Sequence, residues 1–218
     1  MKKVAVILSG CGVFDGSEIH EACAALLSLA REGAEAVVCA PSGRQMHVVD
    51  HAAGQPEPDG SREILGEAAR ISRGEIRPLS EVDPRAVDAV LLPGGFGAAK
   101  NLSTFAVDGA DCTVHAEVES FLRAARTANK AIGAMCIAPV VLAKVFGADL
   151  KPKLTIGTDP DTAAAINAMG AEHVDCHATG VVVDESNRIV TTPAYMLAGG
   201  IAEVFDGAET FVRKLLAL

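Results

Sequence analysis

The sequence is poor in aromatic residues and has no tryptophan: aromatic side chains make up only 4% of its 218 residues, although 50% of the residues are hydrophobic. Alanine and valine supply much of the apolar content, and such small side chains suit helices that pack closely against a parallel sheet. A chain of this length can bury one full hydrophobic core. We therefore expect a single domain over residues 1–218.

Clusters of lysine and arginine are also missing, and the net charge at pH 7 is −9. These features argue against nucleic acid or a membrane as a partner. No apolar run approaches the roughly 18 residues of a membrane-spanning helix, and the run Val4–Leu8 is too short for a secretory signal. The six cysteines, at positions 11, 23, 39, 112, 136 and 176, show neither CxxC pairs nor metal-binding spacing. This pattern of reduced thiols predicts a cytoplasmic protein without a bound metal.

Short apolar runs bounded by glycine or proline alternate with longer amphipathic stretches, which predicts an α/β fold with a three-layer, doubly wound, mostly parallel sheet. The turn Asp184–Asn187 adds a small C-terminal hairpin. Within the long loop Pro41–Gly60 we expect a short hairpin around His47–Asp50. The expected strands are Val4–Ser9, Ala36–Ala40, Ala86–Pro93, Ala131–Cys136, Leu154–Gly157 and His173–Cys176. The expected helices are Ser17–Glu32, Ser61–Arg73, Val114–Ala128, Ala138–Phe146, Thr162–Met169 and Ala198–Leu216.

The loops Gly10–Gly16, Pro93–Leu102 and Gly133–Pro139 follow strands at the edge where an open parallel sheet binds ligands. In the third loop, Ala134 and Ala138 flank Cys136 at the positions where a nucleophile elbow needs small residues. The thiol would then lie at a helix N-terminus, which favours the thiolate. The alternative is a buried core cysteine without chemistry. No GxGxxG or P-loop pattern is present, so we expect no nucleotide cofactor.

Other groups beside Cys136 have the chemistry to assist a thiol. The backbone N–H groups of Gly94, Gly95 and Ile137 are expected to form an oxyanion hole, although a tight turn also explains the glycine pair. Glu18 and Glu21 begin the first helix, and either carboxyl group can share a proton with the thiol. The alternative is that these glutamates only favour the start of the helix. None of the six histidines is adjacent to Cys136.

The segments Leu92–Gly95, Ala99–Leu102 and Met135–Pro139 together resemble the class I glutamine-amidotransferase-like superfamily, which includes deglycase-like and intracellular-protease-like proteins. Over nearly the whole chain the sequence is most similar to the ElbB-type proteins, which have been linked to isoprenoid biosynthesis and described as glyoxalases. The resemblance implies a flavodoxin-like fold, a homodimer and a cysteine nucleophile at Cys136. It also implies a glutamate contact to that cysteine, for which Glu21 matches better while Glu18 remains open.

The activity implied by the resemblance is that of a cofactor-independent glyoxalase, a lyase that converts glyoxal or methylglyoxal to glycolate or lactate through a hemithioacetal on Cys136. Ile137 stands where protease-like relatives have a histidine, and Gly157–Asp159 and Thr192–Ala194 lack the histidines of other relatives. A Cys–His–acid triad is therefore not expected, and proteolysis loses support. A redox-sensitive, stress-responsive or isoprenoid-associated protein without catalysis remains open, as does, with less support, a glutaminase. Cys11 is a further candidate contact whose distance from Cys136 the sequence leaves open.

Overall fold

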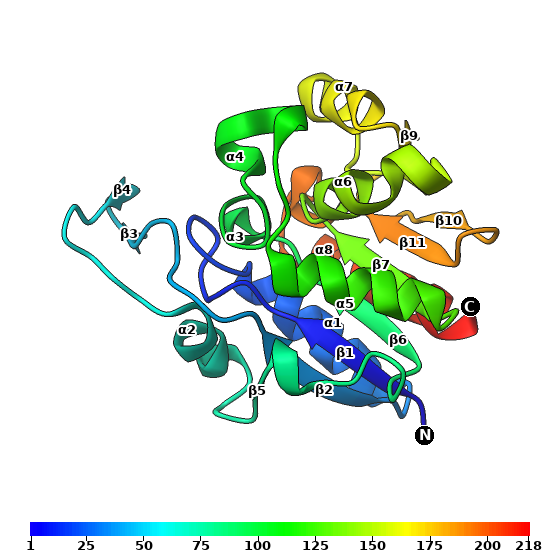
Figure 1. The fold of residues 1–218 in the computed structure, drawn as a ribbon, viewed down its shortest axis with the longest axis horizontal. Helices are drawn as coiled ribbons and strands as arrows, with labels where there is room; N and C mark the ends of the chain where they lie inside the picture. The colour runs from blue at the N-terminus through cyan, green and yellow to red at the C-terminus, as the bar shows by residue number, and fades with distance from the viewer.

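A seven-stranded sheet forms the centre of the molecule in the computed structural model, which describes residues 1–218 (Figure 1). The strand order is β10–β11–β7–β6–β1–β2–β5. Every neighbouring pair is parallel except β10 with β11, so the predicted C-terminal hairpin is confirmed. The strands are β1 (Lys3–Ile7), β2 (Glu35–Ala40), β5 (Arg77–Pro78), β6 (Ala89–Leu92), β7 (Ala131–Met135), β10 (Val182–Asp184) and β11 (Ile189–Thr192).

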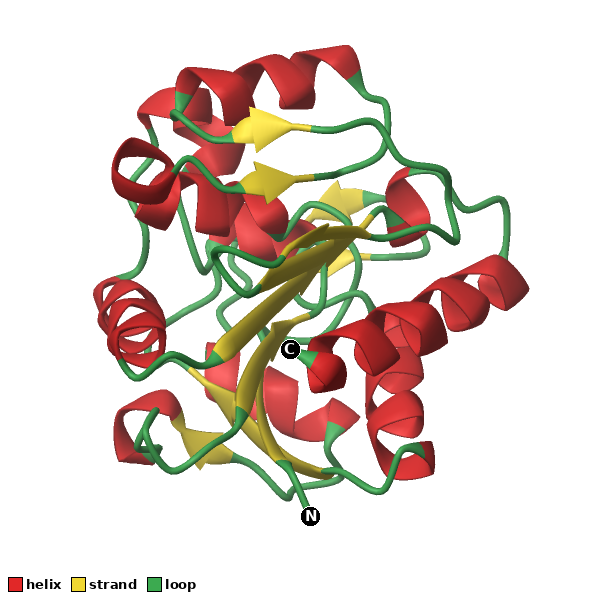
Figure 2. Ribbon diagram, turned by 90° about the vertical axis from the view of Figure 1, so that its right-hand side faces the viewer, coloured by secondary structure: helices red, strands yellow, loops and turns green.

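Helices cover both faces of the sheet, which confirms the predicted three-layer α/β fold (Figure 2). In Figure 1, α5 crosses in front of the sheet, whereas α1 and α8 lie behind it. No helix is both long and apolar enough to span a membrane. The α-helices are α1 (Ile19–Arg31), α2 (Ile64–Ile71), α3 (Phe96–Lys100), α4 (Phe105–Asp108), α5 (Ala116–Thr127), α6 (Pro139–Leu150), α7 (Pro160–Ala168) and α8 (Ile201–Ala217). The 3-10 helices are η1 (Leu79–Glu81), η2 (Gly109–Asp111) and η3 (Ala194–Met196).

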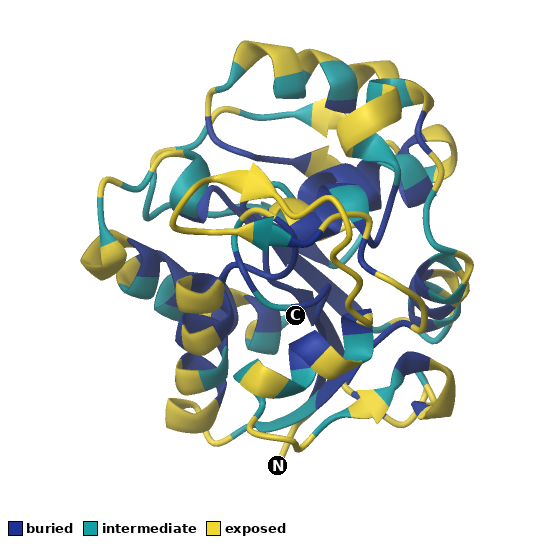
Figure 3. Ribbon diagram, turned by 90° about the vertical axis from the view of Figure 1, so that its left-hand side faces the viewer, coloured by how far each residue is buried: buried dark blue, intermediate teal, exposed yellow.

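The central strands are buried on both faces, as Figure 3 shows by the dark interior of the sheet. Side chains alternate along each strand: Ala5 and Ile7 belong to the core under α5 and α6, whereas Val4 and Val6 belong to the core under α1 and α8. A strand covered on both sides needs apolar side chains at every position, which is why the strand sequences are continuous apolar runs. Asp88 precedes β6, and its carboxylate accepts a hydrogen bond from the Lys3 N–H at 2.7 Å.

The strand order reverses between β1 and β6, because the chain places β2 and β5 on one side of this pair and β7 and β11 on the other. In open parallel sheets the crevice at such a reversal, beyond the carboxyl ends of the strands, is the usual place for a ligand. The loops after β1, β6 and β7 all leave the sheet at this edge. The fold therefore brings the three loops selected from the sequence to one place.

Two predicted strands lie outside the central sheet. β8 (Lys153–Leu154) and β9 (Glu172–His173) are shorter than expected and pair with each other in a separate parallel sheet. Polar side chains of the β10–β11 hairpin take the backbone donors of this segment: Lys153 N–H donates to Asp184 at 2.9 Å, and Thr155 N–H donates to Thr191 Oγ1 at 2.9 Å. The segment is therefore joined to the hairpin by side-chain hydrogen bonds at these two N–H groups, while its strand pairs with β9.

The long loop after β2 contains the predicted short hairpin, formed by β3 (Val49–Asp50) and β4 (Gln55–Pro56). This hairpin extends away from the sheet in Figure 1, and it is largely exposed in Figure 3. Its base is held to the loop after β1, because the Val49 N–H donates to the buried carboxylate of Asp15 at 2.7 Å.

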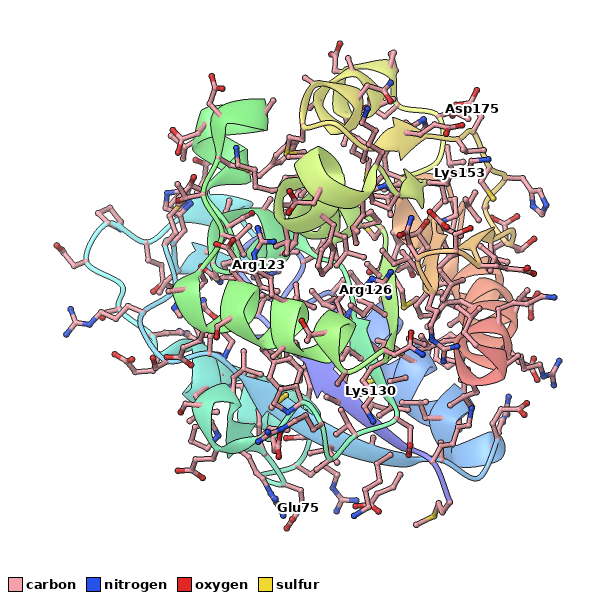
Figure 4. The ribbon with its side chains drawn as sticks, turned by 45° about the vertical axis from the view of Figure 1, so that its right-hand side comes forward. Glu75, Arg123, Arg126, Lys130, Lys153 and Asp175 are labelled. Atoms are coloured by element: carbon pink, nitrogen blue, oxygen red, sulfur yellow. The ribbon has the colours of Figure 1, made fainter.

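Charged side chains mark the outer side of α5. Figure 4 labels Arg123 and Arg126 on this helix and Lys130 just beyond its end. Arg123 pairs with Glu119 at 2.9 Å and with Asp149 at 3.3 Å. The opposite side of the helix packs on the sheet through Val118, Phe121, Leu122 and Ala125.

Candidate active site

Cys136 lies at a sharp turn between β7 and α6. Its φ angle is 61°, in the left-handed region that residues other than glycine seldom adopt. The Cys136 N–H donates to the Thr192 carbonyl at 2.9 Å, which holds the strained turn against the end of β11. Ala134 and Ala138 are both 0% exposed, so larger side chains have no room on either side of the cysteine. The sharp turn expected from the spacing is therefore present.

Glu21, in the first turn of α1, is the carboxyl group that contacts the cysteine. Its side chain is fully buried and hydrogen-bonds with the Cys136 thiol. Gly94 N–H donates to Glu21 Oε2 at 2.9 Å, and Tyr195 N–H donates to Glu21 Oε1 at 3.1 Å. Two backbone donors from separate loops therefore fix the carboxyl group beside the sulfur.

Gly94 has to be glycine for this contact to form. A Cβ atom on Gly94 would collide with Cys136 Cβ and would lie 2.5 Å from Glu21 Oε2, closer than real Cβ atoms approach such neighbours. The missing side chain leaves the space in which the carboxyl and thiol groups meet.

Glu18 has a different place. It is the N-cap of α1, and its carboxylate accepts a hydrogen bond from the Glu21 N–H at 2.7 Å. The Glu18 N–H donates to the Gly94 carbonyl at 2.9 Å. Glu18 lines the cavity above Cys136, but the carboxyl group that contacts the Cys136 sulfur is that of Glu21. Glu18 thus orients the helix turn that carries Glu21.

The expected oxyanion donors separate into two groups. The N–H groups of Gly95 and Ile137 donate to the sulfur of Cys136. The Gly94 N–H points at Glu21 and is therefore not available to a substrate oxygen.

Cys11 is not among the cavity-lining residues. Burial raises the pKa of its thiol, and among the charged side chains Glu67, Arg70 and Asp15 affect it most. No three His, Cys, Asp or Glu side chains are grouped as metal ligands.

The thiol and the carboxyl group both retain protons more strongly than usual. Burial raises the pKa of Glu21 from 4.5 to about 7, even though the Tyr195 and Gly94 N–H groups act to lower it. Burial, and then the negative charge of Glu21, raise the pKa of the Cys136 thiol well above its ordinary value. The expectation that the helix N-terminus favours the thiolate was therefore wrong, because desolvation outweighs the donors on the sulfur. Two negative charges in such a site repel, so the pair holds at least one proton at neutral pH.

A cavity of about 500 Å³ opens above Cys136. Hydrophobic side chains make up 9 of its 14 lining residues, and no histidine is among them. Lys100 and Tyr195 also line it, although neither was predicted as a site residue. Tyr195 is the only tyrosine of the chain, and its hydroxyl group lies 2.7 Å from His20 Nδ1. Lys100 belongs to the Ala99–Leu102 segment, so its position in a recognisable motif was the available signal.

Known proteins are similar to this chain over nearly its whole length. A sequence model of the DJ-1/PfpI family matches residues 2–198. The human glutamine amidotransferase-like class 1 domain-containing protein 3, mitochondrial, is 48% identical over 99% of this chain and 83% of its own length. The mitochondrial ES1 protein of Danio rerio is 34% identical over 99% of this chain and 85% of its own.

Solved structures share the fold. An isoprenoid biosynthesis protein with an amidotransferase-like domain from Ehrlichia chaffeensis superposes with a TM-score of 0.91 at 35% identity, covering 99% of both chains. Drosophila melanogaster DJ-1beta superposes with a TM-score of 0.58 at 21% identity, covering 99% of this chain and 94% of its own.

The predicted cytoplasmic location is wrong by this comparison, because the human, rat and zebrafish relatives are mitochondrial proteins. The prediction was based on reduced cysteines and on the absence of a secretory signal. Neither feature distinguishes the cytosol from another reducing compartment.

Proposed function

This chain belongs to the DJ-1/PfpI family, and from that premise we propose that it is a cofactor-independent glyoxalase. The family includes deglycases and proteases, so enzymatic chemistry at a cysteine is consistent with membership. The proposed reaction adds water to glyoxal or methylglyoxal and yields glycolate or lactate.

The contact between the Glu21 carboxyl group and the Cys136 thiol at the floor of an open cavity carries this proposal. A general base works best when its pKa lies near the working pH, and burial brings Glu21 to about 7. No histidine lines the cavity, so attack on an unactivated amide has little support. An aldehyde is more electrophilic and needs less activation of the thiol.

The reaction starts when Cys136 transfers its proton to Glu21 and its sulfur bonds to the aldehyde carbon. The carbonyl oxygen takes this proton from Glu21 and becomes the hydroxyl group of a hemithioacetal, which leaves Glu21 as a carboxylate again. The Glu21 carboxylate then removes the proton from that carbon to give an enediolate. The hydroxyl proton moves to the neighbouring oxygen, and Glu21 returns its proton to the neighbouring carbon. The product of this step is a 2-hydroxyacyl thioester on Cys136. Water cleaves the thioester, releases the hydroxy acid and restores the thiol.

The Gly95 and Ile137 N–H groups support the same sequence of steps. They donate towards the sulfur, and an oxygen bonded to the adjacent carbon would come within their reach during addition.

The test measures the hydroxy acid formed and not the dicarbonyl lost, because lysine and arginine side chains also react with dicarbonyls without turnover. Glycolate and lactate would be quantified in amine-free buffer for the parent protein, Cys136→Ala and Glu21→Gln. The expected loss is 10²-fold or more for each variant, the usual contribution of a nucleophile or general base. Cys23→Ala is the matched control, because Cys23 is exposed. Equal product formation by Cys136→Ala and the parent would refute the proposal.

A further inference from the structure

The cavity is larger than glyoxal or methylglyoxal requires. A volume of about 500 Å³ falls in the range of sites for drug-sized ligands. Each water-sized group needs about 30 Å³, so methylglyoxal, with five heavy atoms, would fill only a part of the space. Apolar groups, among them Phe96, Phe105 and Met196, form most of the remaining wall. A tightly bound substrate would place an apolar body against these side chains.

Lys100 is the only cation on this wall. Its ammonium group donates to the Phe14 carbonyl at 2.8 Å and lies 5.3 Å from the centre of the Phe96 ring. No carboxylate forms an ion pair with it. Partial burial lowers the pKa of Lys100, and the negative charge of Asp15 opposes this effect without forming an ion pair with the ammonium group. A lysine has three donors, so hydrogen-bonding capacity remains for a ligand.

The two acidic residues that line the cavity would repel an anionic ligand group, whereas Lys100 would attract it. Glu18 and Asp159 are both N-caps, and their carboxylates accept hydrogen bonds from the backbone of their own helices. They line the cavity with Cys136 and would repel a negative group placed beside them. Among the lining side chains, therefore, only that of Lys100 carries a charge that attracts an anionic ligand group.

We propose that the substrate is an α-oxoaldehyde with an apolar body and a distal anionic group, and that Lys100 binds this anion. The inference depends on the proposed glyoxalase function for the reaction at Cys136. The anion site itself is a matter of binding and can be measured without turnover.

Isothermal titration calorimetry of the full chain with 4-acetylbenzoate and acetophenone tests the site. These ketones differ only in the carboxylate and form no stable adduct with a thiol. We expect the parent to bind 4-acetylbenzoate about tenfold more tightly, with a preference that shrinks in high salt. Lys100→Met should abolish the preference and Lys100→Arg should retain it. Lys144→Met is the control, because Lys144 also donates to a backbone carbonyl but lies outside the cavity.

Kinetics with 4-carboxyphenylglyoxal and phenylglyoxal give the second readout. The carboxylate should lower KM about tenfold in the parent and not in Lys100→Met, with similar kcat values, because Lys100 does not touch the reacting carbons. Equal affinity of the parent for both ketones, or a preference that survives in Lys100→Met, would overturn the inference and leave the glyoxalase proposal intact. A Lys100-dependent preference without turnover of any aldehyde would support the anion site and refute the glyoxalase.

Discussion

Replacing Glu21 by glutamine is expected to change how the stability of the protein depends on pH. Burial raises the pKa of Glu21 from 4.5 to about 7. Between these two values the folded protein keeps a proton that the unfolded chain has released. The stabilisation from this proton is full below pH 4.5 and is lost as the pH rises through about 7.

The size of the effect follows from the shift. Between about pH 5 and about pH 8, the ionisation of Glu21 costs the folded state about 2–3 kcal/mol. Glutamine does not titrate, so the Glu21→Gln variant lacks this loss. It is destabilised at low pH because its amide group faces one of the two N–H donors. The difference in unfolding free energy between parent and variant should therefore shrink by about 2–3 kcal/mol from low to high pH.

Urea unfolding at both pH values measures this difference, and subtraction of the variant removes the titration of all other groups. The same pair of measurements in a Cys136→Ala background is the control. The pH-dependent difference should persist there, because burial is the main cause of the raised pKa and the thiol contact acts in the opposite direction. A difference that is constant between the two pH values would refute the argument.

Three further substitutions test other parts of the structure. Gly94→Ala should reduce hydroxy acid formation at least tenfold, because the new Cβ would collide with Cys136 Cβ and lie 2.5 Å from Glu21 Oε2; activity near the parent's would contradict this crowding. Asp159→Ala should lower the free energy of unfolding by about 1 kcal/mol, since Asp159 accepts from the Thr162 N–H at 2.9 Å; Asp159→Asn should recover most of the loss. Phe211→Ala should cost about 3–5 kcal/mol in urea unfolding, because Phe211 is 0% exposed; a loss below about 1 kcal/mol would mean that the site collapses freely.

The turn at Cys136 was predictable because its requirements are local. Small residues at 134 and 138 and a proline at 139 stand next to the cysteine in the sequence. The central strands were predictable for a related reason, because burial on both faces demands uninterrupted apolar runs. Leu154 illustrates the limit: its segment has the pattern of a short buried strand, but it pairs with β9 outside the central sheet, and Thr155 N–H donates to Thr191 in the distant β10–β11 hairpin.

The chemistry of the site depended on long-range contacts that spacing does not record. The thiol of Cys136 lies near a helix start, which alone would lower its pKa, but the depth of burial and the charge of Glu21 reverse the direction. Gly94 and Gly95 are neighbours, but only Gly95 donates to the sulfur, because Glu21 takes the other N–H. Lys100 was expected in a loop, and the short helix α3 is too brief for a periodic pattern to indicate which way the side chain points. The implied homodimer stays a prediction.

The position of Tyr195 gives the protein an optical property. The chain has no tryptophan and a single tyrosine, Tyr195, which lines the cavity. Burial, and then the negative charges of Glu18 and Glu21, raise the pKa of its hydroxyl group. Nearly all intrinsic fluorescence of the folded protein therefore originates from one side chain at the site. Entry of a ligand or a change in the charge of Glu21 should alter the emission without any label, so the unmodified chain can report on its own cavity.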